Sequence, residues 1–203
     1  MARLDFWFEY ASTYAHLAAM RVGAEAATRG VEVVWRPFLL GPIFGAQGWR
    51  DSPFNLYPAK GRNMWRDLAR QAAKHGLAPV VRPEPFPQHS VLAARATLAL
   101  PEARRGAFAV QVFRAEFEAG RDISEPGVIS AALRAAGVAA PAEVLAATQD
   151  PAVKADLRAE GAAAAALGIY GAPSFVAEDG ELFWGHDRME DALDWAAGRA
   201  VRP

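Results

Sequence analysis

The 203-residue chain contains no cysteine. Without thiols it cannot form disulfides, thiolate zinc sites or iron–sulfur clusters, and it cannot use a cysteine nucleophile. The chain also lacks an excess of charge of either sign, because 22 basic residues stand against 23 acidic ones. With a net charge of −1, it has no overall field that would attract nucleic acid or an anionic membrane, and we expect neither as a partner.

Long apolar runs are missing as well, and all of them fall well short of the ~20 residues of a membrane-spanning helix. The first residues enter a strand pattern rather than a signal peptide, so we expect a cytoplasmic protein. The four histidines do not have the spacing of metal ligands, and no metal site is predicted. What remains is a globular chain, 52% hydrophobic, that can bury a core without disulfides or a metal.

The opening of the chain predicts a strand, a helix and a second strand. Apolar and polar side chains alternate over residues 4–10, which indicates a half-buried strand. Residues 14–29 predict a helix that ends at Gly30, and residues 31–36 predict a strand that ends at Pro37. This βαβ order favours a parallel pair of strands.

The middle of the chain predicts a loop and then helices only. Residues 37–58 are rich in proline and glycine and predict a long irregular loop, a kind of segment that is often functional. Helices are predicted at about 60–76, 88–99, 104–120, 126–137, 141–149 and 151–168.

Strand signals return at residues 174–177 and 181–184, around an Asp-Gly turn. A last helix is predicted at 188–199, with Asp187 and Glu190 as a capping box. The whole order predicts an α/β protein with a thioredoxin-like fold and an all-helical insertion. We expect residues 1–58 and 169–203 to form the thioredoxin-like domain and residues 59–168 to form the helical insertion.

Ser12 stands where a thioredoxin-like unit carries its redox cysteines, at the start of the first helix. The amino end of a helix favours an anion such as a thiolate. A serine hydroxyl cannot exchange disulfides, but it can donate a hydrogen bond to a thiolate that another molecule brings. The alternative is that Ser12 only caps the helix.

Pro173 stands directly before the third predicted strand. In thioredoxin-like folds this proline is cis and exposes the backbone of the preceding residue, here Ala172, to an extended peptide-like ligand. The alternative is ordinary proline punctuation at the entrance to a strand.

Two other segments combine charged side chains with loops. Asp187 and Arg188 precede the last helix, where a carboxylate can take a ligand's ammonium group and helix amides can take its carboxylate. Asn55, Lys60 and Arg62 lie among aromatic residues after the long loop. The alternative for the first segment is that Asp187 caps the helix and Arg188 is solvated, and for the second it is a solvated loop.

Together, these segments resemble the 2-hydroxychromene-2-carboxylate isomerase family, within the group of DsbA-like and kappa-class glutathione transferase proteins. The resemblance runs from about Leu4 to Trp195, and it depends on the order and spacing of several motifs. The matching segments are DFWFEYASTY (5–14), WRPFLLG (35–41), NLYPAKGR (55–62), MWRDL (64–68), GAPSF (171–175) and FWGHDRM (183–189). The chain departs from the family at Thr13, where proline is usual, and at Ala172, where valine is usual.

The resemblance implies a DsbA-like fold, a homodimer and a glutathione-dependent enzyme. The family reaction interconverts 2-hydroxychromene-2-carboxylate and trans-o-hydroxybenzylidenepyruvate in the breakdown of aromatic compounds, by addition of the thiolate, bond rotation and elimination. The serine that matches Ser12 hydrogen-bonds the glutathione sulfur. The resemblance assigns the rest of the glutathione site to Asn55, Ala172, Pro173, Asp187 and Arg188.

The substrate is expected to be a small aromatic-derived carboxylate, with Lys60 and Arg62 as candidates to bind its carboxylate group. Candidates for the walls around its ring, which are equally suited to a core, are Phe8, Phe38, Phe44, Trp49 and Tyr57. Two alternatives are a kappa-type transferase that joins glutathione to electrophiles and a non-catalytic binding protein with the thioredoxin fold. Disulfide oxidoreductase activity is excluded by the absence of cysteine.

Overall fold

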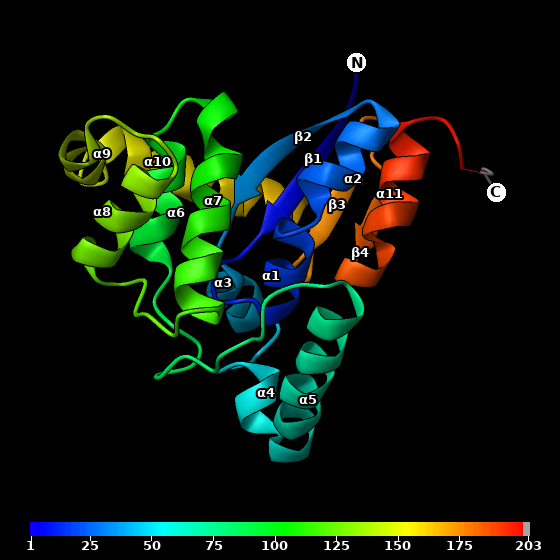
Figure 1. Cartoon of the computed structure of the whole chain (residues 1–203), viewed down its shortest axis with the longest axis horizontal. Helices are drawn as coiled ribbons and strands as arrows, with labels where there is room; N and C mark the ends of the chain where they lie inside the picture. The colour runs from blue at the N-terminus through cyan, green and yellow to red at the C-terminus, as the bar shows by residue number, and fades with distance from the viewer. Residues whose placement is uncertain (201–203) are drawn as a thin grey trace.

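Strands β1 (Ala2–Phe8) and β2 (Val31–Pro37) pair in parallel, as the opening βαβ order predicted. Strand β3 (Ser174–Ala177) pairs antiparallel with β1, and β4 (Leu182–Trp184) pairs antiparallel with β3. The sheet order is β2-β1-β3-β4 in this computed structural model, which describes residues 1–200 (Figure 1). The carboxyl ends of β1, β2 and β4 therefore share one edge of the sheet with the amino end of β3.

Helices cover the sheet and extend beyond β2 on one side of the molecule (Figure 1). In chain order they are α1 (Thr13–Ala19), α2 (Val22–Arg29), α3 (Leu40–Ala46), α4 (Pro53–Leu56), α5 (Pro58–Lys74), α6 (Val91–Leu98), α7 (Glu102–Phe117), α8 (Pro126–Ala135), α9 (Pro141–Ala147), α10 (Pro151–Ala166) and α11 (Met189–Ala196), with a 3-10 turn, η1 (His186–Arg188), before α11. None of the described helices is long and apolar enough to cross a membrane.

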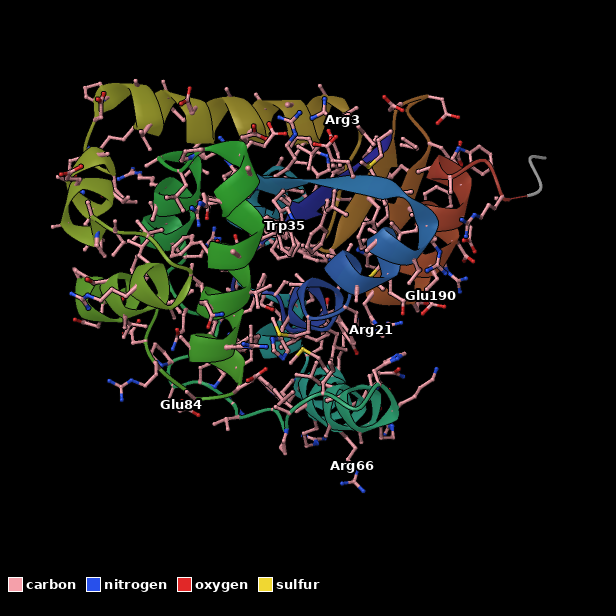
Figure 2. All side chains as sticks on the ribbon, turned by 45° about the horizontal axis from the view of Figure 1, so that its top comes forward. Arg3, Arg21, Trp35, Arg66, Glu84 and Glu190 are labelled. Atoms are coloured by element: carbon pink, nitrogen blue, oxygen red, sulfur yellow. The ribbon has the colours of Figure 1, made fainter. Side chains whose placement is uncertain are left out.

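Both faces of the sheet are buried. On one face, Phe6 and Phe175 stack with ring centroids 5.1 Å apart, within a core that α1, α2, α7 and α11 share. On the other face, Trp7 and Phe38 pack with Ala164 of α10, the helix that crosses this face in Figure 2. The alternation predicted for β1 is present, but the strand is not half-buried, because it lies inside the sheet and helices cover both of its faces.

The main core continues from the sheet into the helical block. Phe113 of α7 lies 5.8 Å from Phe8 and 5.0 Å from Tyr10 between ring centroids, and the same cluster includes Ile129 and Leu133 of α8. The expected division of the chain into two domains stays a prediction.

Two predicted elements are wrong in detail. The helix over residues 14–29 is divided into α1 and α2 at Met20 and Arg21, where Arg21 forms an ion pair with Glu190 of α11. Figure 2 shows these two side chains side by side. The predicted loop over residues 37–58 contains α3 and α4, because proline fits the first turn of a helix as well as a loop.

Helix α1 carries a buried histidine. His16 is fully buried against Phe113 and Phe117, and neither of its ring nitrogens has a hydrogen-bond partner among the described residues. Burial and the nearby charge of Arg114 lower its pKa to about 4. The folded protein therefore holds His16 neutral at a pH where the unfolded chain would protonate it.

We expect His16→Leu to make the free energy of unfolding depend less on pH below about 6.5. Because the folded-state pKa lies below the usual 6.5, the wild type should lose stability as pH falls from about 6.5 to about 4, by up to about 3 kcal/mol relative to the variant. Urea unfolding of both proteins at several pH values measures this difference. A difference in unfolding free energy that does not change with pH would contradict it.

Candidate active site

Ser12 lies at the shared edge of the sheet, just after β1, and is the N-cap of α1. Its Oγ accepts a hydrogen bond from the Ala15 amide at 3.3 Å. The same hydroxyl donates to the carbonyl oxygen of Ala172 at 2.9 Å. Ser12 is therefore a helix cap. It also contacts the loop of Ala172 and Pro173 before β3, called the proline loop below, which lies 160 residues later in the chain.

The Ala172–Pro173 peptide bond is cis, which confirms that prediction. Ala172 is only partly buried, and within residues 1–200 its amide has no hydrogen-bond acceptor. Its carbonyl keeps one lone pair beyond the bond from Ser12. This residue can therefore offer a donor and an acceptor to an extended chain.

The proline loop is joined to the residues before α11. The Gly185 amide donates to the Pro173 carbonyl at 3.0 Å, and Gly185 has a φ of 109°. The predicted capping box is wrong, because residues 186–188 form the 3-10 turn and Asp187 does not cap α11. Instead, Oδ1 of Asp187 lies where a side chain on Gly185 would have to be, 2.5 Å from the position of a Cβ atom.

Asp187 and Arg188 are both exposed beside this loop. The Arg188 guanidinium lies 3.4 Å from Asp187 and 2.9 Å from Asp191. Ion pairs this exposed are weak, so a ligand can replace them at little cost.

Tyr14 joins three elements next to Ser12. Its ring stacks on His186 of η1, with centroids 5.3 Å apart and planes within 2°, and its hydroxyl donates to Asp67 of α5 at 3.0 Å. Burial and Asp67 raise the pKa of Tyr14, so the phenol stays protonated as a donor. Burial lowers the pKa of His186, which favours the neutral ring. The turn from β1 into α1 is therefore held from two sides.

Glu9 forms the floor of the site and was not predicted. Its buried carboxylate accepts from the Leu40 amide at 3.1 Å and from the Ala11 amide at 3.4 Å, while burial raises its pKa. One carboxylate thus ties the start of α3 to the residue before Ser12. The signal in the sequence was an acidic residue on an otherwise apolar strand end.

Asn55 and Arg62 line a separate hollow of about 300 Å³, where α4 and α5 meet. The Asn55 amide nitrogen donates to Asp51 at 3.2 Å and to the Phe86 carbonyl at 3.2 Å. Lys60 does not line this hollow, and its ammonium group lies 5.9 Å from the centre of the Tyr57 ring. The structure therefore brings Ser12 together with the proline loop, and it groups Asn55 with Arg62 but not with Lys60.

The aromatic candidates for the ring walls fall into two groups. Phe8 and Phe38 are fully buried and belong to the core. Trp49 and Tyr57 are exposed, and Phe44 packs against Trp49. An exposed pair that was not predicted, Tyr170 and Trp184, flanks Gly171 beside the proline loop.

The DSBA-like thioredoxin domain family matches residues 3–194 of this chain. No curated protein matches it. Among solved structures, a 2-hydroxychromene-2-carboxylate isomerase is similar with a TM-score of 0.86 and 23% identity, over 97% of this chain and 95% of that one.

Two other similar structures carry the names of disulfide enzymes. One is a probable DsbA oxidoreductase from Streptomyces coelicolor, with a TM-score of 0.74 and 24% identity over 100% of this chain and 93% of that one. The other is the cytosolic disulfide reductase DsbM from Pseudomonas aeruginosa with GSH, with a TM-score of 0.65 and 18% identity over 97% and 96%. These likenesses confirm the predicted DsbA-like thioredoxin fold with its added helices.

We expect Gly185→Ala to destabilise the protein more than Gly180→Ala does. Both glycines have positive φ, so both alanines are strained, by about 1–3 kcal/mol. Only at position 185 does the new methyl group meet Asp187, since no atom lies within 4 Å at position 180. Chemical unfolding of the two variants measures the difference, and equal losses would show that the contact with Asp187 has no effect.

Proposed function

The chain belongs to the DSBA-like thioredoxin domain family, and we propose that it is a glutathione-dependent isomerase of the 2-hydroxychromene-2-carboxylate type. Its reaction would interconvert 2-hydroxychromene-2-carboxylate and trans-o-hydroxybenzylidenepyruvate. The observation that carries the proposal is the 2.9 Å hydrogen bond from Ser12 to Ala172, beside a cis proline in a chain without cysteine. The edge of the sheet where this family places its chemistry offers a hydroxyl and an open backbone, but no sulfur.

The groups around Ser12 suit a tripeptide that carries a thiol, an ammonium group and two carboxylates. Among residues 1–200, no acceptor pairs with the Ala172 amide, and its carbonyl has a spare lone pair, so both can serve the backbone of such a ligand. The exposed Asp187 can take the ammonium group, and Arg188 can take a carboxylate. The GSH-bound DsbM structure, which shares the fold, supports this choice of ligand.

Glutathione, when bound, would supply the thiolate nucleophile that this chain lacks. The Ser12 hydroxyl would donate its hydrogen bond to the sulfur instead of to the Ala172 carbonyl. Lowering a thiol pKa by about 2 units requires roughly 2.7 kcal/mol, within reach of one charge-assisted hydrogen bond together with the amino end of a helix. The bond from the Ala15 amide would keep the hydroxyl oxygen in place while its proton changes acceptor.

The residues around Ser12 would hold the backbone in place while the Ser12 hydroxyl changes its hydrogen-bond acceptor. Tyr14, stacked on His186, fixes the first turn of α1, and Glu9 fixes the residue before Ser12.

We further propose that the protein is a cytoplasmic homodimer. The name of DsbM, a cytosolic enzyme with the same fold, supports the compartment, and the family resemblance supports the dimer.

We expect Ser12→Ala to bind glutathione within a few-fold of wild type but to lose roughly 100-fold or more in isomerisation. The reason is that the backbone contacts would survive while the donor to the sulfur would not. Steady-state kinetics with trans-o-hydroxybenzylidenepyruvate measures the rate, and titration calorimetry measures glutathione binding. The pH dependence of thiolate absorbance should show a higher pKa of bound glutathione in the variant.

Two controls separate chemistry from stability. Ser12→Thr keeps a hydroxyl and should restore most of the activity. Asp150→Ala removes the side-chain cap of α10, which costs about 1 kcal/mol, and should leave activity unchanged. Wild-type turnover in Ser12→Ala would remove Ser12 from the mechanism. Conjugation of a generic electrophile without isomerisation would indicate the transferase, and no affinity for glutathione would indicate a binding protein.

A further inference from the structure

We propose that Arg62 and Arg82 form a receptor for a carboxylate group in the hollow between α4, α5 and the segment that carries Arg82. The hollow is lined by Phe54, Asn55, Pro58, Gly61, Arg62, Trp65 and Arg82. The sequence motifs pointed to Arg62 but not to Arg82, which comes from outside every matching segment. The assignment of this site to the reaction rests on the function proposed above.

The walls of the hollow are tied together. The Asn55 amide donates to the Phe86 carbonyl at 3.2 Å, which joins α4 to the segment after Arg82. The Trp65 ring on α5 packs edge-on against Phe86, with centroids 4.9 Å apart. Gly61 leaves no space for a side chain, because the Phe54 carbonyl of α4 lies against it. The hollow is therefore shaped by contacts between three segments before any ligand enters.

The lining carries two positive charges and no carboxylate. Within the described residues, Arg62 has no ion-pair partner, and Asp51 contacts the lining only by accepting from the Asn55 amide. Arg82 lies 5.8 Å over the Trp65 ring and 3.5 Å from Glu84, a pair that is more than half exposed on both sides. Such a pair is weak, so Arg82 can turn to an anion, and a guanidinium group matches a carboxylate with two parallel hydrogen bonds.

Helix α5, which carries Arg62 and Trp65 of the hollow, also contacts the residue after Ser12. Met64 sits between Arg62 and Trp65 in the chain, and its sulfur accepts a hydrogen bond from the hydroxyl of Thr13 at 3.3 Å. This contact joins α5 to the residue after Ser12, and both of its side chains are buried. In the proposed function, the carboxylate that enters the hollow could belong to the substrate or be the glutathione carboxylate that Arg188 does not take.

Arg66 offers a matched control on the same helix. It is exposed, does not line the hollow and points away from the body of the protein in Figure 2. Removing it changes the net charge of α5 by the same amount as removing Arg62. An effect specific to the hollow should therefore appear with Arg62→Gln and Arg82→Gln but not with Arg66→Gln.

The first experiment needs neither glutathione nor turnover. Benzoate and its neutral analogue benzamide are titrated into the protein while the indole N–H resonance of Trp65 is followed by NMR. We expect benzoate to shift this resonance and benzamide not to. Arg62→Gln or Arg82→Gln should weaken benzoate binding by roughly 10-fold, as expected for loss of a charged hydrogen bond, whereas Arg66→Gln should bind as wild type does. Equal effects of the three variants, or an equal response to benzamide, would overturn the proposal.

The second experiment identifies the source of the carboxylate. Affinity is compared for glutathione and its glycyl ethyl ester, and KM is compared for trans-o-hydroxybenzylidenepyruvate and its methyl ester. A penalty for esterification that disappears in Arg82→Gln marks the ligand whose carboxylate enters the hollow. If neither penalty depends on Arg82, the assignment to this reaction is wrong. Benzoate binding without any glutathione affinity would instead contradict the proposed function and leave the carboxylate site standing.

Discussion

The hydrogen bond from Ser12 to Ala172 joins two segments that lie 160 residues apart in the chain. It brings the amino end of α1 against the proline loop, and the Gly185 amide extends the connection to the residues before α11. A redox enzyme of this fold needs sulfur at this junction, and this chain has a hydroxyl instead. That replacement removes disulfide exchange by the chain's own side chains, and in the function proposed above Ser12 stabilises the sulfur of a bound glutathione.

The polar groups beneath the junction differ in their roles. Glu9 accepts backbone amides and so behaves as a structural anchor, although burial raises its pKa. Glu116 on α7 has no partner for either oxygen among the described residues, and burial with the charge of Glu9 raises its pKa well above the usual range. A neutral Glu116 spares Glu9 a second buried charge nearby. The site is thus supported by one hydrogen-bonded acid and one neutral acid.

Much of the fold could be predicted because the signals were local. The alternation of apolar and polar side chains predicted β1, and glycine and proline residues between segments predicted most helices. The position of Ser12 after a strand predicted its place as a helix cap. Tertiary contacts decided what could not be predicted. The break at Arg21 accompanies an ion pair with Glu190, and the turn at Asp187 follows the bond from Gly185 to Pro173. No pattern in the sequence predicts contacts between residues so far apart in the chain.

The same limit applies to the candidate site. A motif that was quoted as one segment, residues 55–62, proved to serve two places, since Arg62 enters the hollow and Lys60 lies over Tyr57 outside it. Trp65 lies three residues after Arg62 on the same helix, but Arg82 completes the hollow from a position that spacing alone does not connect. Side-chain direction on a helix and the path of a distant segment decide such groupings, and both depend on packing.

The pairing of β1 with β3 has a consequence for how the protein is made. β1 is synthesised long before its antiparallel neighbour, which begins only at Ser174. During translation the nascent chain must therefore hold an unpaired strand edge while the whole helical block emerges from the ribosome. Contacts of such long sequence separation form slowly, so the segment that carries β3 and β4 completes the sheet late.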